Sequence, residues 1–190
     1  MDGSKAALRR RLLAARAALP VEEIERRARA LSDVAAGVGS VASAGSLAAY
    51  VSVGTEPGTR PLLERLAGSG VRVLLPVLLP DRSLDWASYD GAESLRLGEH
   101  GLFEPVGSRL GPAALCSVDV VVVPALAVDR AGRRLGRGGG SYDRALGQVP
   151  PGIPILAAVY AEEVLVRVPA EPHDRPVGGA LTPTGAVRAG

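Results

Sequence analysis

The run of valines at residues 118–123, broken only by Asp119, is the feature that most constrains the fold of this chain. Such a run is typical of a strand that is covered on both faces. Further strands are predicted at residues 46–53, 71–75, 83–89, 153–159 and 164–168, and helices at residues 3–19, 21–37, 59–68 and from 142 to 146. Because strands alternate with helices, we expect an α/β fold with a mostly parallel sheet inside a three-layer α/β/α sandwich.

The connecting segments carry the strongest turn signals. Residues 95–105 are a predicted loop, and residues 125–141 are rich in Gly and Arg. Residues from 169 onward form a tail rich in Pro and Gly, and Pro76 is expected to end its strand. We find no internal repeat and no linker long enough to divide the chain. The sequence therefore predicts one domain over residues 1–190.

Composition excludes several classes of protein. Apolar runs fall short of the roughly 20 residues that a membrane span needs, and the N-terminus has no secretory pattern. Cys116 is the only cysteine, which rules out an internal disulfide, and we expect it to be a small core side chain. A net charge of +2 and 3% aromatic residues argue against nucleic-acid binding. We expect a soluble cytoplasmic monomer that binds neither membranes nor nucleic acid.

The strongest candidate for a binding site is the loop that follows the strand at residues 118–123, because ligands of parallel sheets bind beyond the carboxyl ends of strands. Gly136, Gly138, Gly139 and Gly140 let the backbone approach a ligand closely. Arg134 and Arg137 add charges suited to phosphate. The alternative is a flexible surface loop with solvated arginines. Neither the P-loop pattern nor the dinucleotide-binding pattern matches this segment.

Three carboxylates and two cations are further candidates, and each has a plain alternative. Asp143 and Asp174 can hold Mg²⁺ against a phosphate, or serve as a first-turn helix acid and a turn residue. Glu56 follows a predicted strand and can bind the N–H edge of a ligand such as a pterin, or be an ordinary loop acid. Lys5 and Arg9 share one helix face and can meet a triphosphate, or be solvated.

The only phenylalanine, Phe103, lies in the predicted loop at residues 95–105. It is expected either to form the wall of a pocket or to anchor the loop to the core. Thr59 is expected either to belong to the Glu56 segment or to cap the next helix.

Taken in order, these segments resemble the 5-formyltetrahydrofolate cyclo-ligase family over nearly the whole chain. The matching motifs are Lys5-x-x-x-Arg9, Glu56-x-x-Thr59, Gly101-Leu-Phe-Glu104-Pro105, Pro124 after the apolar strand, Arg134-Leu-Gly136-Arg137-Gly138-Gly139-Gly140-x-Tyr142-Asp143-Arg144 and His173-Asp174-x-Pro176-Val177. The glycine loop with its Tyr-Asp-Arg ending is the most specific of them. The resemblance implies an α/β/α sandwich, in agreement with the pattern of strands and helices.

The resemblance also implies a reaction and a set of site residues. The family uses ATP and Mg²⁺ to convert 5-formyltetrahydrofolate to 5,10-methenyltetrahydrofolate, with release of ADP and phosphate. The implied ATP-binding residues are Lys5, Arg9, Arg134, Leu135, Gly136, Arg137, Gly138, Gly139, Gly140, Ser141 and Tyr142. The implied folate-binding residues are Val51, Glu56, Arg137, Gly138, Gly139, Gly140 and Ser141, and the implied Mg²⁺ ligands are Asp143 and Asp174. Arg137 and Tyr142 are the predicted catalytic residues.

Two departures from the family pattern leave other functions open. Ser141 stands where the family usually has an aromatic residue, and residues 178–183 differ from its usual acidic tail. A non-catalytic relative that binds folate or nucleotide is the main alternative. A different α/β enzyme, acting on a phosphorylated sugar, would also explain the glycine–arginine loop taken alone.

Overall fold

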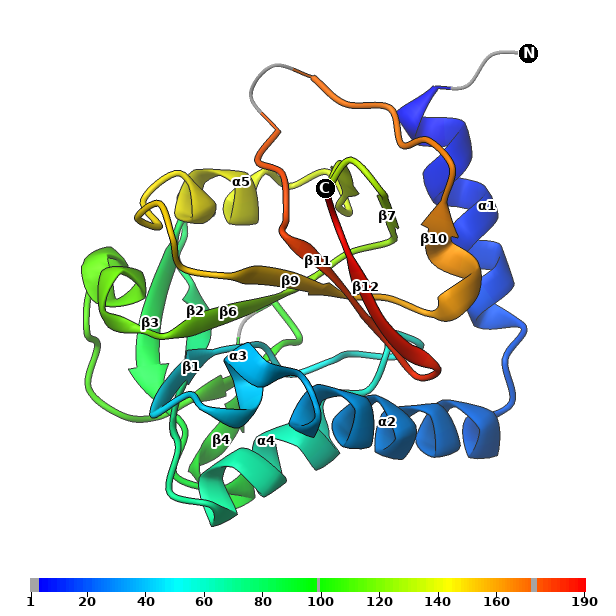
Figure 1. The fold of residues 1–190 in the computed structure, drawn as a ribbon. Helices are drawn as coiled ribbons and strands as arrows, with labels where there is room; N and C mark the ends of the chain where they lie inside the picture. The colour runs from blue at the N-terminus through cyan, green and yellow to red at the C-terminus, as the bar shows by residue number, and fades with distance from the viewer. Residues whose placement is uncertain (1–3, 99, 172–173) are drawn as a thin grey trace.

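A seven-stranded sheet crosses the centre of the part of the chain that the computed structural model describes, residues 4–98, 100–171 and 174–190 (Figure 1). The strand order is β12-β11-β9-β6-β1-β2-β3. The strands are β1 (Ser46–Ala48), β2 (Arg72–Leu78), β3 (Leu84–Ser88), β6 (Val120–Pro124), β9 (Ile155–Ala158), β11 (Gly179–Thr182) and β12 (Gly185–Arg188). Pairing is parallel from β2 through β1, β6 and β9 to β11, and antiparallel only at the two edges. The predicted mostly parallel sheet is therefore confirmed.

Helices cover both faces of this sheet, as the sandwich prediction requires (Figure 1). One face carries α2 (Val21–Ala36), α3 (Gly39–Ala42) and α4 (Arg60–Gly68), and the other carries α5 (Ser141–Leu146) and the 3₁₀ helix η2 (Pro112–Ser117). Successive strand residues point to opposite faces. Leu47 accordingly packs in the core cluster beneath α2 and α4, while its neighbour Ala48 packs in the cluster that contains Leu146 of α5.

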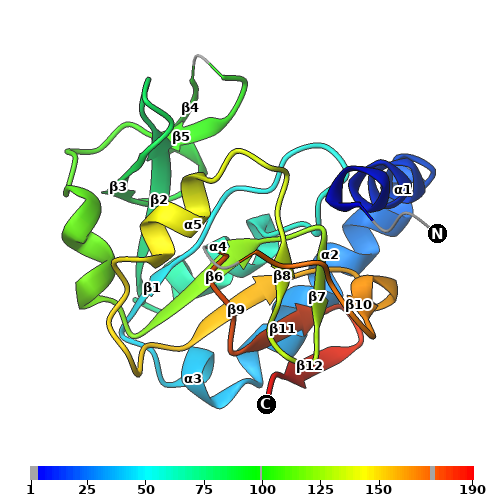
Figure 2. The ribbon, with the colours of Figure 1, turned by 90° about the horizontal axis from the view of Figure 1, so that it is seen from above.

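A smaller unit of secondary structure lies beyond the central sheet and contacts α1 (Lys5–Ala17) (Figure 2). It is a three-stranded sheet of β7 (Ala127–Asp129), β8 (Arg134–Leu135) and β10 (Val164–Leu165), next to the 3₁₀ helix η3 (Ala161–Glu163). Leu12 of α1 packs with Leu126 and Leu135 in a separate core cluster. Packing under α1 therefore orders the first half of the Gly- and Arg-rich segment at residues 125–141, where no strand was predicted.

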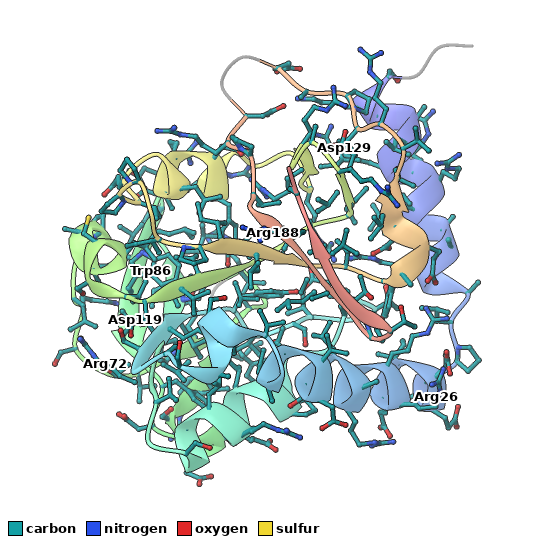
Figure 3. The ribbon with its side chains drawn as sticks, in the orientation of Figure 1. Arg26, Arg72, Trp86, Asp119, Asp129 and Arg188 are labelled. Atoms are coloured by element: carbon teal, nitrogen blue, oxygen red, sulfur yellow. The ribbon has the colours of Figure 1, made fainter. Side chains whose placement is uncertain are left out.

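The buried carboxylate of Asp129 holds this unit together (Figure 3). Its oxygens accept hydrogen bonds from the backbone N–H groups of Ala131 and Arg133 at 3.0 Å and of Val168 at 2.7 Å. The side chain of Arg133 adds an ion pair of 2.7 Å. Asp129 thus fixes the turn before β8, which leads into the glycine loop.

Short hairpins are the elements that the sequence did not reveal. Residues 95–105 contain the hairpin of β4 (Leu95–Leu97) and β5 (Phe103–Pro105), preceded by the 3₁₀ helix η1 (Ala92–Ser94). The tail contains the hairpin β11–β12. Strands of three or four residues are too short to display a clear alternation of apolar and polar side chains, so local pattern could not identify them.

Pro76 was expected to end a strand, but it lies inside β2. Odd-numbered residues from Val73 to Leu79 face β3 with their backbone hydrogen-bonding groups. At the two ends of the pair, Leu79 N–H donates to the carbonyl of Ser83 at 3.0 Å, and Tyr89 N–H donates to the carbonyl of Val73 at 2.9 Å. The nitrogen of Pro76 points the other way, past the end of β1, which pairs only with residues 72–74. A proline is tolerated there because no ladder hydrogen bond is lost.

Two further expectations concern exposure. Cys116 is exposed and its thiol lies 3.4 Å from the carbonyl oxygen of Gln148, so the prediction of a core side chain is wrong.

Within residues 4–98, 100–171 and 174–190, no helix is both long enough and apolar enough to cross a bilayer.

Candidate functional site

A cavity of about 410 Å³ opens at the edge of the central sheet where the parallel strands end. The ends of β1, β2 and β6, the β4–β5 hairpin and the glycine loop form its wall. The predicted site residues that line it are Val51, Glu56, Arg134, Gly136, Arg137, Gly138, Gly139, Gly140, Ser141, Tyr142 and Asp143. Folding thus brings the segment after β1 and the glycine loop, some eighty residues apart, to one cavity.

The segment after β1 is rigid although it is not a strand. Thr59 turns its side chain back toward β1, where its Oγ1 donates to the carbonyl of Tyr50 at 2.6 Å and accepts from Ser52 N–H at 2.9 Å. Thr59 makes no capping hydrogen bond to α4, so its role lies in closing this segment. The segment presents Glu56 to the cavity, and Oε2 of Glu56 accepts from Val53 N–H at 3.0 Å. The predicted strand over residues 46–53 is correspondingly shorter, ending at Ala48.

The glycine loop needs glycine at specific positions. Gly138 has a φ of 102°, and a Cβ there would lie 3.5 Å from the guanidinium carbon of Arg9. Gly140 has a φ of 69° and directly precedes α5. Both values lie in the region that glycine adopts without strain. Because α5 has only six residues, its dipole is small, and backbone amides and arginines are the groups that can bind an anion here.

Two cations of the glycine loop are paired with carboxylates that the sequence had singled out. Arg134 Nη2 donates to Oδ1 of Asp143 at 2.6 Å, and Arg137 Nε donates to Oε1 of Glu56 at 3.0 Å. The side chain of Arg134 is almost fully buried, whereas that of Arg137 is 54% exposed. Glu56 is buried, so its charge depends on Arg137 for compensation.

Helix α1 brings the third pair to the same region. Lys5 Nζ lies 2.7 Å from Oδ2 of Asp174, and Arg9 Nε donates to the carbonyl of Gly136 at 2.9 Å. Burial alone would lower the pKa of Lys5, but hydrogen bonds and charges of Asp174 and Glu171 outweigh it and raise that pKa above its usual value. Lys5, Arg9 and Asp174 do not line the cavity itself. His173, which belongs to the tail motif, lies outside the described residues.

The electrostatics of Tyr142 restrict what its hydroxyl can do. Burial is the main cause of a raised pKa for Tyr142, and the negative charge of Glu56 adds to it. The hydroxyl therefore stays protonated near neutral pH and can donate a hydrogen bond but cannot serve as a base.

Leu135, like Lys5 and Arg9, is a predicted ATP-binding residue that does not line the cavity. The side chain of Leu135 is fully buried in the cluster under α1 with Leu12 and Val168. Its main chain belongs to β8, which is continuous with the glycine loop. The packing of its side chain therefore fixes the position of the strand from which the glycine loop starts.

The structure adds cavity residues that sequence reasoning missed. Tyr50, Arg16, Leu78 and Arg82 line the cavity, although none of them belongs to a motif that signals binding. Phe103 lines it as well and is stacked against Arg60, whose guanidinium carbon lies 4.8 Å from the ring centroid. Phe103 is therefore a wall residue, and at 39% exposure it does not anchor the hairpin to the core.

The carboxylates of the site limit how a divalent metal could be held. Within the part of the chain that the structure describes, no three His, Cys, Asp or Glu side chains form a cluster that could hold a metal ion alone. Mg²⁺ commonly uses one or two carboxylates together with substrate phosphates and water. Arg175 Nη2 donates to the carbonyl of Gly147 at 3.2 Å, which ties the tail next to Asp174 to the end of α5. Asp143, which lines the cavity, and Asp174, which pairs with Lys5 beside it, are carboxylates of the type that a metal bound together with a phosphate uses.

Comparison with known proteins gives consistent matches. The model of the 5-formyltetrahydrofolate cyclo-ligase family matches residues 1–183. A 5-formyltetrahydrofolate cyclo-ligase of Mycolicibacterium smegmatis is 42% identical over 185 residues, covering 95% of this chain and 94% of the relative. The enzyme of the same name from Escherichia coli is 33% identical over 148 residues, 76% of this chain and 81% of the relative. The NMR structure of Aquifex aeolicus 5,10-methenyltetrahydrofolate synthetase superposes with a TM-score of 0.83 at 27% identity, covering 97% of this chain and 92% of that structure.

Proposed function

The chain belongs to the 5-formyltetrahydrofolate cyclo-ligase family of enzymes. From this we propose that it uses ATP and Mg²⁺ to join the formyl carbon of 5-formyltetrahydrofolate to N10, which closes a new ring. The products would be 5,10-methenyltetrahydrofolate, ADP and phosphate. The observation that carries the proposal is the single cavity shared by Glu56 and the glycine loop, because the reaction needs folate and a phosphoryl group in contact.

The chemistry requires activation of a poor leaving group. The formyl oxygen of the folate attacks the γ-phosphorus of ATP, the bond from that phosphorus to the β–γ bridging oxygen breaks, and ADP leaves. N10 of the same folate then attacks the formyl carbon and loses its proton. The carbon–oxygen bond breaks and releases phosphate, which leaves the methenyl bridge. The protein has to position both substrates and to stabilise the charge that moves during phosphoryl transfer.

For the folate, we assign Glu56 and Val51 to the pterin end. The carboxylate of Glu56 accepts hydrogen bonds, and the pterin offers N–H donors along one edge. Both residues are buried at the carboxyl end of β1, and both line the cavity. The rigid segment closed by Thr59 would keep this acceptor in place.

For ATP, we assign Lys5 and Arg9 of α1, Arg134 and the glycine loop to the phosphates. The guanidinium and ammonium groups make charge-assisted hydrogen bonds to phosphate oxygens. Arg9 already holds the loop through Gly136, so α1 and the loop would bind the nucleotide together. Arg137 and the protonated hydroxyl of Tyr142 would donate to the oxygens of the transferring phosphoryl group.

For the metal, Asp143 and Asp174 are the side chains that fit. When bound, Mg²⁺ would neutralise charge on the phosphates during transfer. One carboxylate, Asp143, would hold it from α5, and the other, Asp174, would hold it from the tail. Arg134 and Lys5, which pair with these carboxylates, are also the cations assigned to phosphate. Binding of the metal and the nucleotide together would therefore replace both ion pairs.

A direct assay tests the proposed function. Purified protein is mixed with 5-formyltetrahydrofolate, Mg²⁺ and ATP, and the near-ultraviolet absorbance of the methenyl product is followed. We expect a rise that depends on ATP. If folded protein binds 5-formyltetrahydrofolate but forms no product, the alternative of a non-catalytic folate-binding relative holds. Turnover of a sugar phosphate without ATP would support the other enzyme class instead.

We also propose that the protein acts in the cytoplasm. The exposed thiol of Cys116 suits a reducing compartment. Localisation of a tagged copy by fractionation would test this.

A further inference from the structure

Glu56 and Arg137 are each assigned above to a different ligand, yet in the structure they bind each other. Oε1 of Glu56 accepts from Arg137 Nε, while Oε2 is taken by the backbone of its own segment at Val53. A pterin that binds this carboxylate must therefore compete with Arg137 for Oε1. The competition follows from the geometry of the two side chains.

The two members of the pair differ in how free they are to move. Arg137 is half-exposed, and among the described residues Glu56 is the one hydrogen-bond partner recorded for its guanidinium. It lies in a loop between Gly136 and Gly138, and the positive φ of Gly138 shows that this backbone uses glycine's wider range. Glu56 is buried and held by a rigid segment. Any rearrangement would consequently move Arg137 and leave Glu56 in place.

The burial of Glu56 also sets when Arg137 can leave. A buried carboxylate without a donor is strongly unfavourable, so Arg137 stays until another donor replaces it. The N–H edge of a folate is such a donor. Once released, the guanidinium is next to the loop that is assigned to the phosphates of ATP, since residues 136–143 line the same cavity.

We propose that Glu56 is a positioning residue as well as a folate ligand: it retains Arg137 until folate arrives, and folate binding then frees Arg137 for the γ-phosphate of ATP. This inference rests on the proposed function, because it needs both ligands in one cavity. It makes ATP bind the folate-free enzyme without help from Arg137. It also couples the two binding events, so that each ligand raises the affinity of the enzyme for the other.

The first test is nucleotide binding without folate. A non-hydrolysable ATP analogue with Mg²⁺ is titrated calorimetrically into wild type, Glu56→Gln, Arg137→Ala and the double variant. We expect Glu56→Gln to bind the analogue on the order of tenfold more tightly than wild type, because Arg137 is free. In the Arg137→Ala background, Glu56→Gln should have no effect. Asp33→Asn is the matched control, because it removes a carboxylate from Arg65 on the surface, and its affinity should equal that of wild type.

The result that would overturn the proposal is an unchanged or weaker nucleotide affinity in Glu56→Gln. A gain that persists in the double variant, relative to Arg137→Ala, would also overturn it, because removal of negative charge alone would then explain the gain.

A second measurement does not depend on altering Glu56. Saturating 5-formyltetrahydrofolate should raise the affinity of wild type for the ATP analogue, and Arg137→Ala should lose this enhancement. Equal enhancement in both proteins would contradict the release of Arg137. If wild type forms methenyl product but shows no coupling, this inference fails while the proposed function stands. If wild type binds no folate and forms no product, the proposed function fails first.

Discussion

The guanidinium of Arg134 donates to the carboxylate of Asp143 across 2.6 Å, so a cation assigned to phosphate neutralises a carboxylate assigned to metal. The same relationship joins Lys5 to Asp174 and Arg137 to Glu56. Each of these three cations is thus balanced by a carboxylate. This arrangement avoids the cost of leaving half-buried charges unpaired before substrates arrive.

The Asp143 assignment predicts a metal-specific defect. Asp143→Asn keeps the shape of the side chain but removes its charge, so the Mg²⁺ concentration needed for half-maximal turnover should rise at least tenfold. A Mg²⁺ titration of methenyl formation measures this, with Asp33→Asn as control. Wild-type Mg²⁺ dependence in folded Asp143→Asn would defeat the metal assignment.

Tyr142 should act as a hydrogen-bond donor throughout the neutral range. Because burial and Glu56 raise its pKa, no loss of wild-type activity from ionisation of this hydroxyl is expected up to about pH 9. Tyr142→Phe should lower kcat by roughly ten- to a hundredfold with a small change in the KM for folate. Tyr89→Phe, a buried tyrosine that does not line the cavity, serves as control. An unchanged kcat in Tyr142→Phe would rule out a catalytic role.

Lys5 should contribute to nucleotide binding from outside the cavity wall. Lys5→Met removes the ammonium group that pairs with Asp174 and is assigned to phosphate, so the KM for ATP should rise about tenfold while the KM for folate stays near that of wild type. Arg10→Met alters the exposed neighbour on the same helix and should change neither constant. Steady-state kinetics with each substrate varied in turn provides the comparison. Equal increases in both KM values would indicate a general structural defect.

The stability of α1 should depend on a buried ion pair. Arg16 donates to both carboxylate oxygens of Glu163, at 2.6 and 2.7 Å, and both side chains are buried. Arg16→Met would leave Glu163 as an uncompensated charge, which costs about 3–5 kcal/mol of unfolding free energy. Urea denaturation measures this loss.

Two comparison variants test the cause of that loss. Replacing Arg16 and Glu163 together with Met should recover most of the stability, because no buried charge remains. Arg26→Met breaks only the exposed pair with Glu23 and should change stability little. A double variant as unstable as Arg16→Met would show that packing, and not charge, is responsible.

Asp129 should make stability depend on acid pH. Burial alone would raise the pKa of Asp129, but hydrogen bonds from Val168 and Arg133 outweigh it and lower that pKa below the ordinary value. The ionised form is therefore favoured in the folded state. Its contribution is complete above the unfolded pKa of about 3.9 and is lost as the pH falls through the lower folded pKa.

Urea midpoints between pH 6 and pH 2.5 check this expectation. Asp129→Asn should be less stable than wild type at pH 6, and the difference should shrink at the acid end. A difference that stays constant with pH would mean that hydrogen-bond geometry, and not ionisation, is what Asp129 contributes.

Much of the fold could be read from local pattern. The helices at residues 5–17 and 21–36 and the strand β6 were predicted within a few residues, because helical spacing and long apolar runs record which face is buried. The hairpins β4–β5 and β11–β12 were missed. Their strands have three or four residues. β11 and β12 form at the edge of the central sheet, whereas β4 and β5 pair with each other in a separate two-stranded sheet.

The candidate site divides along the same line. The glycine loop and Glu56 were found from residue type and position after a strand, since both features are local. Tyr50 and Arg16 were missed, because their sequence neighbourhoods look like an ordinary strand and an ordinary helix. The contact of Phe103 with the cavity could be settled only by the position of its hairpin.

The sequence by itself determined the order of the longer helices and strands, the mostly parallel pairing and the residue types that suit phosphate, metal and pterin. Tertiary structure alone decided that Lys5 meets Asp174 across 169 residues and that Arg137 meets Glu56 across 81. The physical reason is that backbone geometry and side-chain periodicity act over a few residues. The pairing of distant charges depends on how the whole core packs.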